Sequence, residues 1–316
     1  MSNLLGIFAF AFSVTGPIFV ILLLGIVLAR IGLITDAFID AGSKLVFNVT
    51  LPALLFITIS KTSIEQTASF SLIGYGLIAT LSVYLLLEVL ATYFIQPPQE
   101  RGVVVQGAFR SNMGIVGLAY CVNAYGEVGL AAASLYLGPV TILFNVLGVL
   151  TLNRSLNKHR SLAGTLTDIA KNPLILGIVL ALPVAWSKVQ LPVVLVKSGE
   201  YFAQMTLPLA LLCTGASLSL KALRAESRNA IVAAVGKLML VPLLITFGGY
   251  WLGFREMDLG ILFLMTSSPT AAASYIMVRA MKGNSVLAAN IIALTTLGSL
   301  LVASVGVALL RHQGLM

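Results

Sequence analysis

The chain consists of long apolar runs separated by short polar segments. Ten of these runs approach the roughly 20 residues that an α-helix needs to cross a bilayer. None alternates in polarity as the strands of a membrane barrel do. The pattern therefore predicts an all-α protein integral to a lipid bilayer. We expect ten membrane-spanning helices at residues 8–29, 41–60, 70–95, 102–123, 130–152, 172–187, 199–219, 229–250, 259–280 and 285–310.

The composition excludes a soluble domain and a nucleic-acid binder. Of the 316 residues, 59% are hydrophobic and 9% are charged, whereas soluble domains carry roughly 25% charged residues. The net charge is +8, but the Lys and Arg residues lie almost entirely in short loops between apolar runs. Such loops indicate membrane topology, and we expect no nucleic-acid partner.

The second half of the chain repeats landmarks of the first. Residues 48–52 (Asn-Val-Thr-Leu-Pro) match residues 204–208 (Gln-Met-Thr-Leu-Pro) at an offset of 156 residues. At the same offset Pro17 matches Pro173, and the polar pair 111–112 matches the pair 267–268. Several landmarks in one order at one offset indicate an internal repeat.

The repeat predicts the domain organisation. Because each half contains five spans, an odd number, the second half would be inserted upside down, as in many secondary transporters. We expect one five-helix repeat at 1–152, a basic cytoplasmic linker at 153–171 and an inverted repeat at 172–316. With this linker inside the cell, most of the 19 Lys and Arg residues lie on the cytoplasmic side. The positive-inside rule then puts both termini outside the cytoplasm.

Two spans are interrupted by polar residues at corresponding positions of the repeats. The fourth span contains Arg110-Ser111-Asn112, and the ninth contains residues 267–270 (Ser-Ser-Pro-Thr). Irregular backbone at membrane depth is tolerated where it lines a cavity or is buried in protein. Half-helix N-termini favour an anion, and half-helix C-termini favour a cation. These segments therefore predict a binding site for a small anion, although such residues also kink well-packed helices.

Arg110 is the main candidate for binding a carboxylate. A guanidinium presents a planar fork to a carboxylate; alternatively, Arg110 snorkels to the interface or caps helix carbonyls. Asn48 and Gln204, matched by the repeat, are expected to contact substrate from the second and seventh spans, although amides also join membrane helices. The full set of candidate substrate-binding residues is Arg110, Ser111, Asn112, Asn48, Gln204, Ser267, Ser268, Pro269, Thr270 and Asn145.

Glu88 and Lys237 lie at similar depths in the third and eighth spans. We expect a neutralising structural pair; a proton-coupling role for Glu88 and cavity-facing positions for both residues are the alternatives. Neither interrupted segment contains Asp or Glu, so proton coupling through these segments is not expected. The neutral oxygens of Ser111, Asn112, Ser267, Ser268 and Thr270 are candidate ligands for a coupling Na⁺, and an uncoupled uniporter is the alternative.

The chain carries no motif of an intramembrane enzyme. It lacks H-E-x-x-H, G-x-S-x-G and P-loop patterns, and its histidines, His159 and His312, lie in a loop and near the end of the chain. We expect no enzymatic activity and no cofactor apart from a candidate coupling Na⁺ or H⁺.

Several motifs resemble the auxin efflux carrier family, which includes plant PIN-type auxin exporters and bacterial permeases for malonate and malate. The motifs are residues 110–118 (RSNMGIVGL), 51–56 (LPALLF), 172–173 (NP), 208–218 (PLALLCTGASL) and 268–271 (SPTA) followed by 288–289 (AA). One departure is Gly117-Leu118-Ala119, where relatives often have Gly-Leu-Pro.

The resemblance implies a fold and a function. It implies crossed, broken fourth and ninth helices, a scaffold of spans 1, 2, 6 and 7, a mobile transport domain from the other spans, and a homodimer through the scaffold. It also implies a secondary carrier for a small organic anion in a bacterial inner (plasma) membrane. The alternatives are a sodium-coupled carrier of the bile-acid symporter kind and a sensor that binds ligand without moving it.

Overall fold

The structure is a computed structural model that describes residues 2–62, 69–156, 167, 170–189, 191–218 and 228–316. Within these ranges the regular elements are helical, and the bridge between Ser111 and Thr270 is an isolated backbone pairing. The predicted all-α class is therefore confirmed for the described residues.

The first half contains α1 (Ser2–Arg30), α2 (Asp36–Leu45), η1 (Val46–Thr50), α3 (Leu51–Ser60), α5 (Phe70–Phe94), η2 (Pro98–Glu100), α6 (Arg101–Phe109), η3 (Met113–Gly117) and α7 (Leu118–Leu156). The second half contains α9 (Pro173–Ser187), α10 (Val193–Ala216), α12 (Arg228–Val235), η4 (Gly236–Leu240), α13 (Val241–Trp251), α14 (Glu256–Ser267), α15 (Ala273–Ala280) and α16 (Ser285–His312). The elements η1, η3 and η4 are π-helical turns.

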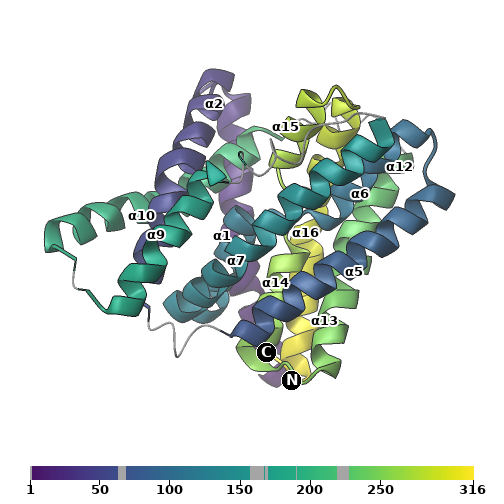
Figure 1. Ribbon diagram of the computed structural model, residues 1–316. Helices are drawn as coiled ribbons and strands as arrows, with labels where there is room; N and C mark the ends of the chain where they lie inside the picture. Colours follow the sequence, from purple (N-terminus) through teal and green to yellow (C-terminus); the bar gives the residue numbers. More distant parts are fainter. Residues whose placement is uncertain (1, 63–68, 157–166, 168–169, 190, 219–227) are drawn as a thin grey trace.

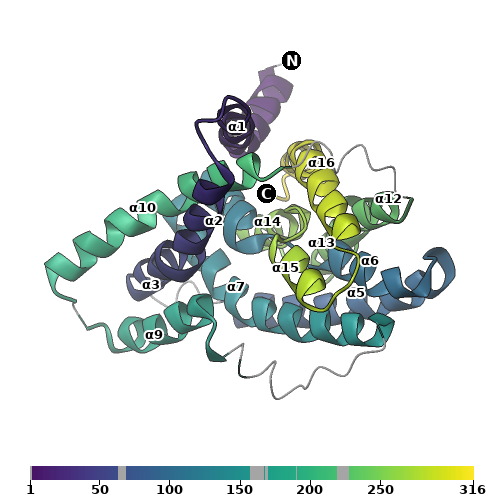
Figure 2. The same cartoon turned by 90° about the horizontal axis from the view of Figure 1, so that it is seen from above.

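The helices pack in two groups (Figures 1 and 2). One group contains α1, α2, α3, α9 and α10, and the other contains α5, α6, α7 and α12 to α16. The groups meet along α1, α3 and α7, and Thr15 of α1 shares a 2.8 Å hydroxyl hydrogen bond with Ser304 of α16. The two interrupted helices lie within the second group.

Several helix boundaries differ from the predicted spans because helices extend beyond their apolar cores. The span predicted to begin at residue 41 begins at Asp36, where the hydroxyl of Thr35 caps the helix by accepting from the Phe38 amide. The span predicted to begin at residue 199 begins at Val193 and ends at Ala216. The predicted linker begins inside α7, and most of it lies outside the described residues.

The chain leaves helical geometry between the predicted fourth and fifth spans. The stretch α7, from Leu118 to Leu156, consists of two helices that meet at Gly126, whose φ of 64° and ψ of −152° are not helical. Six helical segments within the described residues are long and apolar enough to cross a membrane by length and composition. The other helices that fall in predicted spans are α10 and the shorter helices α6, α9, α14 and α15.

The helix boundaries recur at the offset of the sequence repeat. Shifted back by 156 residues, α10 covers 37–60, which matches the continuous helix at Asp36–Ser60. In the same way α16 covers 129–156, the part of α7 that follows its bend. Lys282, with a positive φ of 56°, then coincides with Gly126. The bounds of these two helices and the positive-φ residue therefore recur at the repeat offset.

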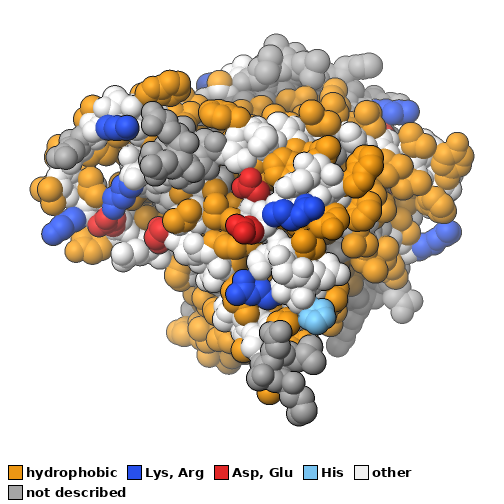
Figure 3. All heavy atoms as spheres, turned by 90° about the horizontal axis from the view of Figure 1, so that it is seen from below, with side chains coloured by type: hydrophobic (Ala, Val, Ile, Leu, Met, Phe, Trp, Pro, Cys, Tyr) orange, Lys and Arg blue, Asp and Glu red, His pale blue; other side chains and the backbone are white. Residues whose placement is uncertain are grey.

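The outer surface is strongly apolar. Large aromatic side chains are exposed on several helices, including Trp251, which is 82% exposed, and Trp186, which is 78% exposed. In the view from below, hydrophobic side chains predominate among the coloured atoms and charged ones are few (Figure 3). A soluble protein rarely exposes apolar patches of this extent, so the surface is that of an integral membrane protein.

Candidate transport site

The two interrupted helices meet at their breaks. The first break separates α6 from η3 and contains Arg110, Ser111 and Asn112; the second separates α14 from α15. The amide of Asn112 donates to the Pro269 carbonyl at 2.7 Å, and the amide of Ala271 donates to the Arg110 carbonyl at 3.0 Å. Each break therefore supplies backbone partners that the other needs in a medium without water.

A cavity of about 1220 Å³ lies against these breaks. It is bordered by Arg110, Ser111 and Asn112, and by the N-terminal ends of η3 and α15. From the other group of helices, α2 and η1 contribute Lys44, Phe47 and Asn48. The cavity thus lies between the two groups, and both breaks border it.

Arg110 is a buried cation on the wall of this cavity. It is 6% exposed, and its Nη2 donates to the Asn145 Oδ1 at 2.7 Å. Its Nη1 lies 3.7 Å from the Met277 sulfur, a weak acceptor. Among the described residues no carboxylate forms an ion pair with this guanidinium. Its charge is therefore matched by neutral groups, which leaves it able to attract an anion.

The hydroxyl-bearing residues of the breaks are buried and bonded to backbone. Ser267 donates to the Leu264 carbonyl, Ser268 to the Met265 carbonyl and Thr270 to the Gly107 carbonyl. The Thr295 hydroxyl accepts from the amide of Thr270 at 3.1 Å. Thr270 alone of these three predicted residues borders the cavity; Ser267, Ser268 and Pro269 lie behind its wall.

The predicted ion pair between Glu88 and Lys237 does not form. Glu88 accepts from the hydroxyl of Thr151 and, at 3.4 Å, from Arg154. Lys237 is fully buried and donates to the Ser111 hydroxyl and, at 2.7 Å, to the Thr266 carbonyl. The two residues were matched by depth alone, and the structure gives them different neighbours across their helices.

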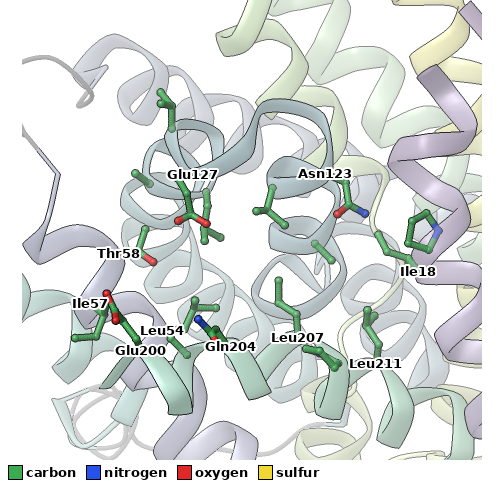
Figure 4. A pocket seen from close by; sticks show the side chains of 18 of the residues that line it. Ile18, Leu54, Ile57, Thr58, Asn123, Glu127, Glu200, Gln204, Leu207 and Leu211 are labelled. Carbon is green, nitrogen blue, oxygen red and sulfur yellow. The ribbon is translucent and has the colours of Figure 1, made fainter. Parts of the chain in front are cut away.

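Asn48 and Gln204 do not meet at one site. Asn48 borders the large cavity and donates to the Lys44 carbonyl at 2.8 Å. Gln204 borders a second cavity of about 750 Å³. Figure 4 shows Glu127 and Gln204 extending into this second cavity from facing helices. The helix from Asp36 to Ser60 borders the large cavity with its first half and the small cavity with its last turns, so the cavities lie toward opposite ends of the molecule.

The sequence prediction missed Gln106. This side chain is fully buried one helical turn before Arg110, its Nε2 lies 3.1 Å from the Met277 sulfur, and its Oε1 has no partner among the described residues. A signal was present, because Gln106 is a polar residue in an otherwise apolar stretch, four positions before Arg110 and therefore on the same helix face. No pattern in the sequence indicated that Met277 would contact Gln106 and Arg110.

Comparison with known proteins gives the family of this chain. The pattern of the family described as "Membrane transport protein" matches residues 11–307. The chain belongs to this membrane transport family. The resemblance to auxin efflux carriers drawn from the motifs is thereby confirmed.

Two archaeal proteins are similar to this member of the family over most of their length. An uncharacterized transporter of Methanocaldococcus jannaschii is 25% identical over 294 residues, which cover 90% of this chain and 94% of the relative. An uncharacterized transporter of Methanothermobacter thermautotrophicus is 24% identical over 265 residues, which cover 80% and 83%. These relatives support a role in membrane transport and leave the substrate unspecified.

Proposed function

We propose that this family member is a secondary carrier for small organic anions and works by alternating access at the two helix breaks. The substrate class is mono- or dicarboxylates such as malonate and malate, or an auxin-like acid. One observation carries the proposal. Arg110 is a buried cation without a carboxylate partner among the described residues, and it borders a cavity of about 1220 Å³.

The surroundings of Arg110 favour a negative charge. The cavity also touches Met113 and Ala273, the first residues of η3 and α15. The first amides of a helix have no partners within the helix and carry a partial positive charge. A carboxylate beside Arg110 would therefore meet a guanidinium and two helix N-termini, which is the arrangement that binds anions elsewhere.

The rest of the cavity wall favours an organic anion over an inorganic one. Phe47 and Phe144 line it, together with Leu137, Ile276 and Ile292. Small-molecule sites commonly combine an apolar wall with a few polar groups that fix orientation. We assign the carboxylate to Arg110 and Asn145, and the carbon skeleton to the apolar wall, with Asn48 and Asn112 as further polar contacts.

Two cavities toward opposite ends suggest the transport cycle. In our proposal the group containing α1, α2, α3, α9 and α10 is the scaffold, and the second group is the mobile transport domain. The recurring helix boundaries support two inverted five-helix repeats with ten spans. With both termini outside the cytoplasm, the large cavity opens inward. We further propose a homodimer formed through the scaffold in a plasma membrane.

A sensor that binds the same anion without moving it is the second candidate. The observation that favours it is the same cavity, since binding alone would use the same groups. A sodium-coupled symporter of the bile-acid kind is the third, favoured by the oxygen-rich helix breaks. Flux separates the carrier from the sensor, and dependence on Na⁺ separates coupled from uncoupled carriers.

Uptake into proteoliposomes tests the proposal. Purified protein would be reconstituted, and uptake of radiolabelled malonate, malate and an aromatic monocarboxylate would be measured with imposed Na⁺, H⁺ and voltage gradients. We expect uptake of at least one acid by the wild type and a loss of at least about 100-fold in Arg110→Gln, because a charge-assisted hydrogen bond contributes about 1.5–3 kcal/mol and two are removed.

A matched control keeps the test specific. Arg101→Gln removes an arginine at the start of α6, the helix that precedes Arg110. The Arg101 guanidinium donates to the carbonyls of Ile95 and Thr92, away from the large cavity. Its uptake should stay within about twofold of the wild type. Undiminished uptake by folded Arg110→Gln would contradict the proposed site. Binding of an acid without flux in any gradient would favour the sensor.

A further inference from the structure

Lys237 is a second buried cation, and the proposed binding of substrate does not use it. Its side chain is fully buried on the π-helical turn η4 and does not border the large cavity. Its ammonium donates to the Ser111 hydroxyl of the first break and, at 2.7 Å, to the Thr266 carbonyl beside the second. Among the described residues it forms no ion pair with a carboxylate.

The oxygen atoms that hold Lys237 are of the kind that hold Na⁺. Thr266 lies in the last turn of α14, where carbonyls have no amide partner within the helix and carry a partial negative charge. Neutral hydroxyl and carbonyl oxygens suit a hard cation. An ammonium group with three donors satisfies the same oxygens.

Three of the other candidate Na⁺ ligands hold their hydroxyl hydrogens in hydrogen bonds to backbone carbonyls. The hydroxyl of Ser267 is directed to the Leu264 carbonyl and that of Ser268 to the Met265 carbonyl, both on their own helix. Thr270 directs its hydroxyl across to the Gly107 carbonyl of α6 at 2.6 Å. A sodium ion at Ser111 would in addition lie within a few ångströms of the Lys237 ammonium and would be repelled by it.

We infer that the Lys237 ammonium takes the place that a coupling Na⁺ would need, so that this carrier has its cation built into the fold. The residues of the breaks therefore do not fit a sodium site while Lys237 is present. The ammonium joins α14, η4 and the first break into one unit, and transport proceeds without Na⁺. This inference extends the proposed carrier function by excluding Na⁺ as its coupling ion.

The first test is the sodium dependence of uptake, and this arm rests on the proposed function. Malonate and malate uptake would be compared in NaCl and in N-methylglucamine chloride of equal ionic strength on both sides of the membrane. We expect equal rates within about twofold. A loss of tenfold or more without Na⁺ would overturn the inference. Absence of uptake in either salt would contradict the proposed function instead.

The second test does not require transport. Thermal unfolding of detergent-purified protein would be measured in the same two salts. The wild type should unfold at the same temperature in both. Lys237→Met, which keeps the length and removes the charge, should unfold several degrees lower in N-methylglucamine and recover part of this loss in NaCl, because the freed oxygens accept Na⁺.

The control is Lys197→Met, which changes an exposed lysine on α10. It should unfold like the wild type in both salts. A sodium-specific stabilisation of the wild type, or identical midpoints of Lys237→Met in the two salts, would overturn the inference. If Lys237→Met does not fold, the wild-type comparison alone carries the test.

Discussion

Ser111 of the first helix break faces Thr270 of the second in an antiparallel backbone bridge. The flanking amides of Asn112 and Ala271 donate across the bridge at 2.7 and 3.0 Å. These bonds satisfy backbone groups that the interrupted helices leave free at membrane depth, where an unpaired group costs several kcal/mol. Neither break would be stable alone, so the two breaks form one structural unit that borders the cavity.

Asn145 supplies a neutral acceptor to Arg110, because its Oδ1 accepts from Nη2 at 2.7 Å. We predict that Asn145→Asp lowers the apparent affinity for the transported acid by about 10- to 100-fold, because the new carboxylate would bind the guanidinium and compete with substrate. The measurement is the KM for uptake. Thr141→Asp, which adds a carboxylate to the same cavity wall one turn earlier on α7, should have a smaller effect. An equal loss of affinity in both variants would indicate that any carboxylate in the cavity wall repels the substrate anion, whether or not it binds Arg110.

Gly148 provides the space in which Gln106 and Arg110 pack. A Cβ at this position would lie 2.8 Å from the Gln106 Nε2, 3.2 Å from the Met277 sulfur and 3.4 Å from the Arg110 Nη1. We predict that Gly148→Ala raises KM and lowers stability by about 1–3 kcal/mol, the usual cost of overpacking. Gly74→Ala is the control, since its Cβ would meet no atom within 4 Å. An unchanged KM in Gly148→Ala would show that the packing of Gln106 and Arg110 against Gly148 does not affect substrate binding.

The two cavities should be accessible from opposite sides of the membrane. In a background without Cys121 and Cys213, both free and buried, Asn48→Cys should react with an impermeant maleimide from one side and Gln204→Cys from the other. The physical reason is that these residues border cavities at opposite ends of the molecule. The measurement is gel-shift labelling of oriented vesicles. Labelling of both positions from one side would contradict the proposed alternating-access arrangement.

Glu88 should contribute to stability more than to transport. Its carboxylate accepts from Thr151 and Arg154 and is separate from Lys237. We predict that Glu88→Gln lowers the free energy of unfolding by about 1 kcal/mol and leaves uptake within about twofold. Thermal unfolding and proteoliposome uptake check this. If Glu88→Lys abolishes uptake and the additional change Lys237→Glu restores it, this result would support the ion pair that was predicted from the sequence.

Membership of the family, the all-helical class and the positions of both breaks could be predicted from the sequence. Apolar run length decides whether a segment suits a bilayer. Proline and clustered polar residues stop a helix where they occur, as at Arg110-Ser111-Asn112 and Pro269. These properties depend on neighbouring residues in the chain, so they could be predicted from the sequence without knowing how the helices pack.

The tertiary structure decided which residues are partners. Lys237 lies on the π-helical turn η4, and Asn48 lies on η1. Depth along a span does not determine the direction in which a side chain points, and the π-turn at Lys237 also changes the rotation of its helix. Depth therefore did not predict that Lys237 contacts Ser111 while Glu88 contacts Thr151. Gln204 likewise corresponds to Asn48 at the repeat offset of 156 residues, but Gln204 borders the small cavity and Asn48 the large one. Local sequence determined where each helix runs and breaks, and long-range packing determined which polar side chains of different helices are in contact.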